Sequence, residues 1–535
     1  MIKNYLKIAW RNLIKNKGYS AINIGGLAVG MAVAILIGLW IWDELSYNKY
    51  HDNYDRIVRV MQHQNYNGGI ETQFANPAVM AAEIRNKYGA DFKYVLQSSW
   101  NFQHTLSFGE KKLLKTGNFF EPEVADMLSL KMLYGTRSGL KEPYSIMLSE
   151  SVAIAFFGHS DPVNKVLRMD NKVDIKVTGV YEDLPYNTTF RDMTFILPWD
   201  LYLIQEPWIK KMENPWGSNF TQTFAQLSEN ADLNKASARI KNVKLNAVNA
   251  FEKRYNPVVF LEPMKNWHLR GEYKNGKSTG GAIQYVWLFG IIGMFVLLLA
   301  CINFMNLSTA RSEKRAREVG VRKAIGSDRW QLIVQFFSES LLVVLFAFLL
   351  SLILVYLALP FFNDVADKKL SLLWRNPIFW MLGIGFSIVT GLIAGSYPAL
   401  YLSSFQPVKV LKGTFQAGRY ASLPRKVLVV LQFSVSVMLI IGTIIVYQQI
   451  QHAKSRPVGY SRESLITVSS NDVLHKKFEV LRNELKDDHL VVDIAESTSP
   501  TTDVYNTNGG FDWEGKDPNL AVDFPNSGVT YEFGK

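Results

Sequence analysis

Cysteine is nearly absent from this chain, because Cys301 is the single one among 535 residues. One cysteine excludes an intramolecular disulfide and carries no information about the redox compartment. Cys301 lies inside an apolar run. We therefore interpret it as a small hydrophobic residue of the core.

Catalytic and metal-binding signatures are missing from residues 43–282. This segment has no HExxH, GxSxG or CxxC motif, and its five histidines lack metal-ligand spacing. A phosphate-loop pattern, GEYKNGKS, occupies 271–278, but it follows a polar stretch and leads directly into an apolar run. A true phosphate loop follows a buried strand and opens a soluble helix, so we interpret the match as chance. The sequence thus predicts no catalytic residue, cofactor or metal, and no enzyme.

Acidic residues are absent from 1–20 and 403–426, and basic residues exceed acidic ones in 307–330. These segments alternate with five apolar runs, each long enough for the roughly 20 residues that cross a bilayer. Short loops rich in Lys and Arg stay in the cytoplasm. The N-terminus and both loops are therefore expected to be cytoplasmic. The net charge of +11 is this same signal, so nucleic acid is not expected as a partner.

The N-terminal segment has two competing interpretations. A cleaved signal peptide is disfavoured, because the first apolar run continues to Trp42 with no cleavage site before a polar start. Within 2–17, basic residues recur every four positions beside an apolar stripe. That pattern predicts an amphipathic helix on the inner leaflet, and a disordered basic tail is the alternative.

These observations divide the chain into membrane, cytoplasmic and outer segments. We expect an amphipathic helix at 1–20, an outer domain at 43–282 and cytoplasmic loops at 307–330 and 403–426. A short outer loop is expected at 360–376 and a second, incomplete outer domain at 449–535. The expected spans are 21–42, 283–306, 331–359, 377–402 and 427–448.

The outer domain 43–282 has a mixed α and β pattern. Residues 145–149 predict a strand and 150–157 a helix that Gly158 ends. Residues 166–169 and 173–181 predict a hairpin across Asp170-Asn171. A further helix is expected at 78–87.

The most specific motif lies in the loop 307–330, where ARSEKRAREVGVRKAIG covers 310–326. It predicts a charged helix, a break or close packing point at Gly320, and a second break at Gly326. The two charge signs and the bounding glycines favour a docking surface over a loop that has no partner. The candidate docking residues are Glu318, Gly320, Arg322, Lys323, Ala324, Ile325 and Gly326.

This motif resembles the signature of the MacB/FtsX permeases of ABC transporters, which Glu318, Gly320, Arg322 and 324–326 match. Gln335, Phe336 and Glu339 continue the resemblance in the third apolar run. Further matches are 149–158, Asp161-Pro162, Lys165, 177–180, 395–399, Pro407-Val408 and 411–413. Asn164 departs from the family glycine at a turn.

The resemblance implies an α-helical membrane protein with an α+β, MacB periplasmic core-like domain inserted between the first two transmembrane helices. Residues beyond 420 look like a second copy, in which 460–468 parallels 54–60, the helix 478–486 parallels 79–87 and the strand 491–497 parallels 95–99. We therefore expect a two-unit, eight-span protein that lacks its C-terminal half-unit here.

Such a permease is expected in the bacterial inner membrane, with a separate cytoplasmic ABC ATPase as its partner. The resemblance implies that the ATPase drives export, or drives movement of the outer domain without a transport channel. A dimer or pseudo-dimer of permease units is expected, and a periplasmic adaptor or outer-membrane channel is a candidate further partner. The alternative is an FtsX-like sensor or scaffold that regulates cell-wall hydrolases or signalling.

Overall fold

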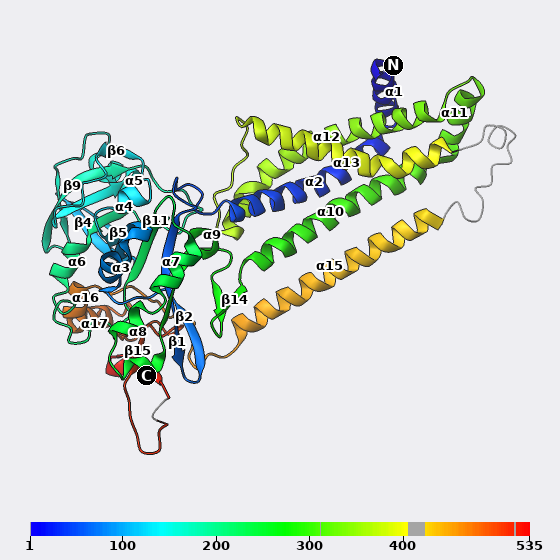
Figure 1. The fold of residues 1–535 in the computed structure, drawn as a ribbon. Helices are drawn as coiled ribbons and strands as arrows, with labels where there is room; N and C mark the ends of the chain where they lie inside the picture. The colour runs from blue at the N-terminus through cyan, green and yellow to red at the C-terminus, as the bar shows by residue number, and fades with distance from the viewer. Residues whose placement is uncertain (1, 311, 405–422, 518–519, 535) are drawn as a thin grey trace. The chain divides into compact units, whose positions relative to one another are not determined.

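A computed structural model describes residues 2–310, 312–404, 423–517 and 520–534 (Figure 1). The chain forms two units: a helical unit of residues 1–47 and 282–456, and an outer unit of residues 48–281 and 457–535. The family-like residues Pro407, Val408 and 411–413, and most of the predicted loop 403–426, lie outside the described residues.

The described part of the helical unit contains five helices that are long and apolar enough to cross a membrane. Each predicted span lies within one of them, and each helix continues beyond the apolar run at one or both ends. The helices are α2 (Lys17–Leu45), α10 (Ile283–Ala310), α12 (Arg329–Ala366), α13 (Pro377–Ser403) and α15 (Leu423–Ser455).

The core of the helical unit is formed by α2, α10, α12 and α13. A buried cluster joins Leu27 and Met31 of α2 to Cys301 of α10 and Val344 of α12, which confirms Cys301 as a core residue. Small residues bring these helices close together, and a Cβ at Gly30 would collide with Ala300 of α10. The helix α15 lies beside α10, and none of its apolar window is buried.

The N-terminal segment forms α1 (Ile2–Lys15), so the predicted helix is confirmed and the disordered tail is wrong. It packs on α12: Ala9 is buried, the rings of Trp10 and Phe346 are 5.8 Å apart, and Asn12 Nδ2 donates to Glu339 Oε1 at 3.1 Å. Its position on the inner leaflet stays a prediction.

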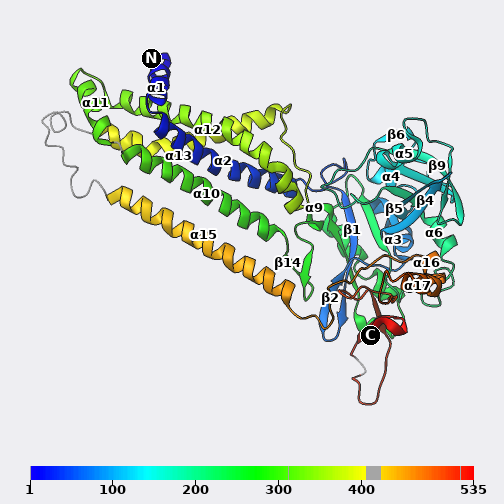
Figure 2. The ribbon, with the colours of Figure 1, turned by 180° about the vertical axis from the view of Figure 1, so that it is seen from behind.

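The outer unit is built on a sheet of twelve strands in which most neighbours are antiparallel. The order is β10-β7-β9-β8-β4-β5-β3-β11-β1-β12, and the extra parallel pairing of β10 with β5 closes six strands into a barrel. Figure 2 shows β4, β5 and β9 of this barrel within the outer unit. The strands are β1 (Ile57–Tyr66), β2 (Gly69–Gln73), β3 (Phe92–Ser98), β4 (Phe102–Phe108), β5 (Lys111–Phe120), β6 (Met132–Gly135), β7 (Ser145–Ser149), β8 (Val166–Met169), β9 (Val173–Tyr181), β10 (Phe195–Pro198), β11 (Gln222–Leu227) and β12 (Val258–Pro263).

Short helices cover the sheet and the ends of the barrel. One core fills the barrel around Phe119, Phe195 and Ile175, and another lies between the β1–β11–β12 part of the sheet and α3, α7 and α8. The helices are α3 (Met80–Tyr88), α4 (Val124–Met127), α5 (Glu150–Phe157), α6 (Trp199–Gln205), α7 (Leu233–Ile240), α8 (Val243–Ala247) and α9 (Met264–Trp267), with 3-10 turns η1 (Gly89–Asp91) and η2 (Glu252–Tyr255).

Local predictions in this domain are confirmed. The strand 145–149, the helix 150–157 and both strands of the hairpin have the predicted bounds, and the predicted helix 78–87 is α3. Asp170 and Asn171 both have positive φ, +51° and +56°, and the Lys172 amide donates to the Met169 carbonyl at 2.9 Å, so they form the tight turn within a three-residue hairpin loop.

The second outer segment matches its prediction only in part. The helix expected at 478–486 is α17 (Phe478–Asp487), but the strand expected at 491–497 is wrong, since only Ser497 forms an isolated bridge. Residues 460–468 also form no strand. Their counterpart β1 is paired on both sides by β11 and β12. No such strands flank 460–468 in the described chain. The segment also holds α16 (Asp472–Lys476), β15 (Asn506–Gly509), β16 (Asp523–Asn526) and η3 (Tyr531–Gly534).

Candidate docking site between α10 and α12

The predicted docking motif forms the helix α11 (Ser312–Ala324), which connects α10 to α12. The helix continues through Gly320, which is buried, so this glycine is a packing point and not a break. Gly326 has φ +102° and ends the helix, which confirms the second predicted break. Asp328 and Gln331 then form a capping box at the start of α12.

One apolar contact seats α11 on the ends of two neighbouring helices. Val319 is buried among Leu332 and Phe336 of α12 and Ala399 and Leu402 of α13. Through this one side chain α11 contacts both α12 and α13.

Arg322 begins a chain of polar contacts that leads from α11 to α1. Its guanidinium donates to Glu318 Oε1 at 2.6 Å and to Gln335 of α12. Gln335 Nε2 donates to Glu339 Oε1 at 3.2 Å, and Asn12 of α1 donates to the same oxygen. Glu339 is nearly buried, so these donors offset the cost of placing a carboxylate there.

Lys323 makes a second connection, to the end of α13. Its Nζ donates to the Ser403 carbonyl at 2.6 Å, and Arg329 Nε lies 3.5 Å from Ser403 Oγ. Two cations at the C-terminal end of a helix interact favourably with its dipole. Partial burial, and then the neighbouring Arg329, lower the pKa of Lys323.

The opposite side of this region is apolar and open. Ile325 is 81% exposed and Trp330 is 71% exposed, and Val321 is also exposed. The predicted residues thus separate into two groups. Gly320, Arg322 and Lys323 face neighbouring helices, whereas Glu318, Ala324, Ile325 and Gly326 are exposed.

Sequence reasoning did not assign four residues to this site, although it had noted Gln335 as a family match and Val321 within the motif. Val321 and Trp330 belong to the exposed apolar surface, and Gln335 and Ser403 receive Arg322 and Lys323. Large apolar residues inside a strongly charged loop were a usable sequence signal for the first two. The contact with Ser403 depends on the fold, because 80 residues separate it from Lys323.

The phosphate-loop pattern has a different structure and is no part of this site. Residues 271–278 form most of a hairpin, β13 (Glu272–Lys274) and β14 (Lys277–Gly280), which turns at Asn275-Gly276. Lys277 therefore lies in a strand, where no helix N-terminus or loop of amides surrounds it. This geometry supports the interpretation of a chance match.

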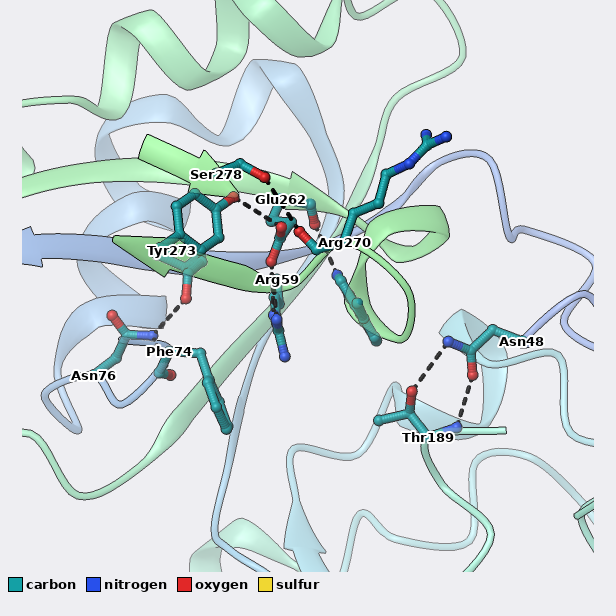
Figure 3. A network of polar contacts seen from close by, with 11 residues as sticks. Asn48, Arg59, Phe74, Asn76, Thr189, Glu262, Arg270, Tyr273 and Ser278 are labelled. Atoms are coloured by element: carbon teal, nitrogen blue, oxygen red, sulfur yellow. Dashed lines mark hydrogen bonds and ion pairs between the residues drawn. The ribbon is translucent and has the colours of Figure 1, made fainter. Parts of the chain in front are cut away.

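A buried ion pair anchors that hairpin (Figure 3). Tyr273 Oη donates to Glu262 Oε1 at 2.8 Å, and Arg59 Nη2 lies 2.9 Å from Glu262 Oε2. The Arg59 guanidinium also stacks 4.7 Å from the Phe74 ring centroid. These contacts are satisfied within the domain, so they indicate a structural role.

Two family models match the chain. The MacB-like periplasmic core domain matches residues 20–243, and the FtsX-like permease C-terminal domain matches 290–407, which includes α11. This chain is a MacB/FtsX-type permease. It is 25% identical to the Bacillus subtilis ABC transporter permease YknZ over 52% of this chain and 62% of the relative. It is 24% identical to the macrolide export ATP-binding/permease protein MacB of Bdellovibrio bacteriovorus over 55% of this chain and 41% of the relative.

The permease therefore matches less than two thirds of the length of each of these two relatives. A third relative, the permease YvrN of Bacillus subtilis, is 21% identical over 76% of this chain and 99% of the relative. Among solved structures, a permease domain from Porphyromonas gingivalis has a TM-score of 0.34 at 17% identity, with 44% of this chain and 98% of that domain covered. The periplasmic region of MacB from Actinobacillus actinomycetemcomitans has a TM-score of 0.28 at 16% identity, with coverage of 38% and 88%.

Proposed function

We propose that this permease is the membrane subunit of an ABC-type export or mechanotransmission complex, whose energy comes from a separate cytoplasmic ATPase. The five apolar helices span the bacterial inner membrane with the N-terminus inside, and the outer domain is inserted between the first two. The chain performs no catalysis of its own. Its two matched family models and the five spanning-length helices support this assignment.

The observation that carries the proposal is the two-sided character of α11. One side is tied to α12, α13 and, through Glu339, to α1. On the other side, Val321 of α11, Ile325 just after it and Trp330 in the first turn of α12 are large exposed apolar side chains beside charged residues. An apolar centre with a charged rim is typical of a protein interface. The ATPase binds the exposed side, and its movement passes to the helices through the packed side.

Copurification of the ATPase with the full-length permease tests this assignment. Ile325→Asp should lower recovery of the ATPase by about tenfold or more, because loss of a central interface anchor typically costs about 2 kcal/mol or more. Ile70→Asp, at an exposed position of the outer domain, is the matched control. Unchanged recovery with Ile325→Asp would refute α11 as the docking element.

A second variant separates docking from coupling. Glu318→Ala with Arg322→Ala removes the polar link to Gln335 and leaves the apolar surface intact. We expect the ATPase to bind this variant and to hydrolyse ATP, but without export or movement of the outer domain. Full output from the variant would mean that the Arg322 chain has no part in transmission.

A further inference from the structure

A group of three charges, one buried and two largely buried, lies at the end of the helical unit where α2 continues into the outer unit. Lys368 Nζ is 2.8 Å from Asp43 Oδ2 and 2.7 Å from Glu44 Oε1. The Lys368 side chain is 11% exposed, that of Asp43 17% and that of Glu44 7%. Burial lowers the pKa of Lys368, but the two adjacent carboxylates outweigh burial and raise it. The ammonium is therefore held charged between two acids.

The segment that carries Lys368 is itself ordered by local bonds. It connects α12 to α13, and Asp367, with φ +48°, ends α12. Asn363 fastens the segment with two side-chain bonds to the Leu370 backbone, each of 2.9 Å. Leu372 is buried against Ala32 and Val355. Lys368 thus extends from a fixed loop to the last turn of α2.

The chain that follows α2 is fixed again only a few residues later. Asn48, buried with φ +65°, is the first residue of the outer unit. Its Oδ1 accepts from Thr189 N at 2.7 Å and from Thr188 Oγ1 at 3.0 Å, and its Nδ2 donates to Thr189 Oγ1 at 3.0 Å (Figure 3). Only residues 45–47 separate Glu44 from Asn48.

The same two helices, α12 and α13, are therefore held at both ends. At one end α11 contacts them through Val319, Arg322 and Lys323. At the other end their connecting loop holds α2 through Lys368. We propose that Lys368 is a positioning residue that passes movement of the α12–α13 pair to the outer domain through the end of α2. This inference rests on the proposed function, because it names the output of that coupling.

The variant Lys368→Met removes the charge and keeps the length of the side chain. Lys368→Arg retains the charge and serves as the rescue variant. Lys369→Met, at the exposed neighbouring lysine, is the matched control. Hydrogen exchange of each variant, without the ATPase and in lipid nanodiscs, is compared with that of the unsubstituted chain. With Lys368→Met, amides of 43–48 and 367–371 should exchange about tenfold faster or more, whereas the other two variants should stay within about threefold of the unsubstituted chain.

The second measurement uses the complex with the copurified ATPase, before and after trapping with ATP and orthovanadate. Lys368→Met should hydrolyse ATP within about twofold of the unsubstituted complex, since it leaves the α11 region intact. It should lose the ATP-dependent change in exchange at 48–52, which Lys368→Arg and Lys369→Met should keep. If Lys368 only stabilised the fold, its substitution would not abolish the ATP-dependent change in exchange while leaving ATP hydrolysis intact.

The outcomes decide the two proposals separately. Unchanged exchange at 43–48 with Lys368→Met, or an ATP-dependent change that persists in this variant, overturns the positioning role. Failure of any ATPase to copurify with the unsubstituted chain contradicts the proposed function. Exchange in the chain alone then decides whether Lys368 holds the end of α2.

Discussion

Lys244 is the most deeply buried lysine that the structure describes in the outer domain, at 1% exposure. Its Nζ donates to Asn219 Oδ1 at 2.7 Å and to Gln62 Oε1 at 3.0 Å, and both acceptors are neutral. Burial lowers the pKa of Lys244 to about 8, and Glu252 opposes the shift only in part. Below about pH 8, the folded domain therefore carries a buried Lys244 ammonium, which burial disfavours.

The consequence is a stability that depends on pH. A lysine with a pKa of about 8 when folded and 10.5 when unfolded binds its proton more weakly in the folded state. Its destabilising effect is complete below about pH 8 and is relieved as the pH rises toward about 10.5, by an amount on the order of 3 kcal/mol. Lys244→Met should remove this dependence. Thermal unfolding of both proteins from about pH 7 to about pH 11 measures it.

The difference between the two proteins isolates Lys244 from the tyrosines that titrate in the same range. Lys253→Met, at an exposed position, is the control and should leave the pH dependence unchanged. An identical pH dependence for Lys244→Met and the unsubstituted chain would show that Lys244 is solvated.

At the scale of elements, α12 and α13 approach each other at glycines. A Cβ at Gly391 would lie 2.5 Å from Leu341 Cδ2, and one at Gly395 would lie 2.9 Å from Ser340 Cβ. Close helix contact at small residues is the common packing mode in membranes, where the lipid supplies no hydrophobic driving force between helices. The proposed transmission from α11 to the loop that carries Lys368 requires α12 and α13 to stay together.

Gly391→Val should force α13 away from α12 and destabilise the bundle by about 1–3 kcal/mol, the usual cost of overpacking. Gly385→Val is the matched control on the same helix, since a Cβ there meets nothing within 4 Å. Thermal stability in lipid nanodiscs should fall for the first variant alone. Equal effects from both substitutions would assign the loss to helix propensity and not to packing.

Apolar length and turn residues were enough to predict many of these elements. The lengths of the hydrophobic runs correctly predicted the five long apolar helices, and Asp170-Asn171 correctly predicted the hairpin turn. The closed barrel was beyond sequence reasoning, because the pairing of β10 with β5 joins residues far apart in the chain. For the same reason the motif at 310–326 identified α11, but the fold alone showed that Arg322 and Lys323 contact Gln335 and Ser403. The prediction of a strand at 491–497 was wrong, because a strand forms only where neighbouring strands pair with it, and Ser497 alone makes a bridge here.

At the scale of the whole molecule, the proposed topology can be tested by labelling. In a Cys301→Ala background, Asn230→Cys should react with a membrane-impermeant thiol reagent in intact spheroplasts. Asn508→Cys should react as well, because α15 is expected to run in the same direction as α2. Ile325→Cys, at an exposed position, should react only after the cells are opened. If Ile325→Cys reacted equally fast before and after the cells are opened, the α11 region would lie outside the membrane. The proposed topology and the cytoplasmic docking site would then be wrong.

The sheet register also sets an order of events during synthesis. The strand β1 emerges first and pairs locally with β2 over 62–66, but its partners over 57–63 are β11 at 222–227 and β12 at 258–263. Pairings this distant in sequence form slowly, since a long loop must close before any bond is gained. Under the proposed topology, the 57–61 part of β1 crosses the membrane with both edges unpaired and waits for most of the domain to follow. Nascent chains are thus most prone to aggregate in this interval, when a chaperone outside the membrane would protect them.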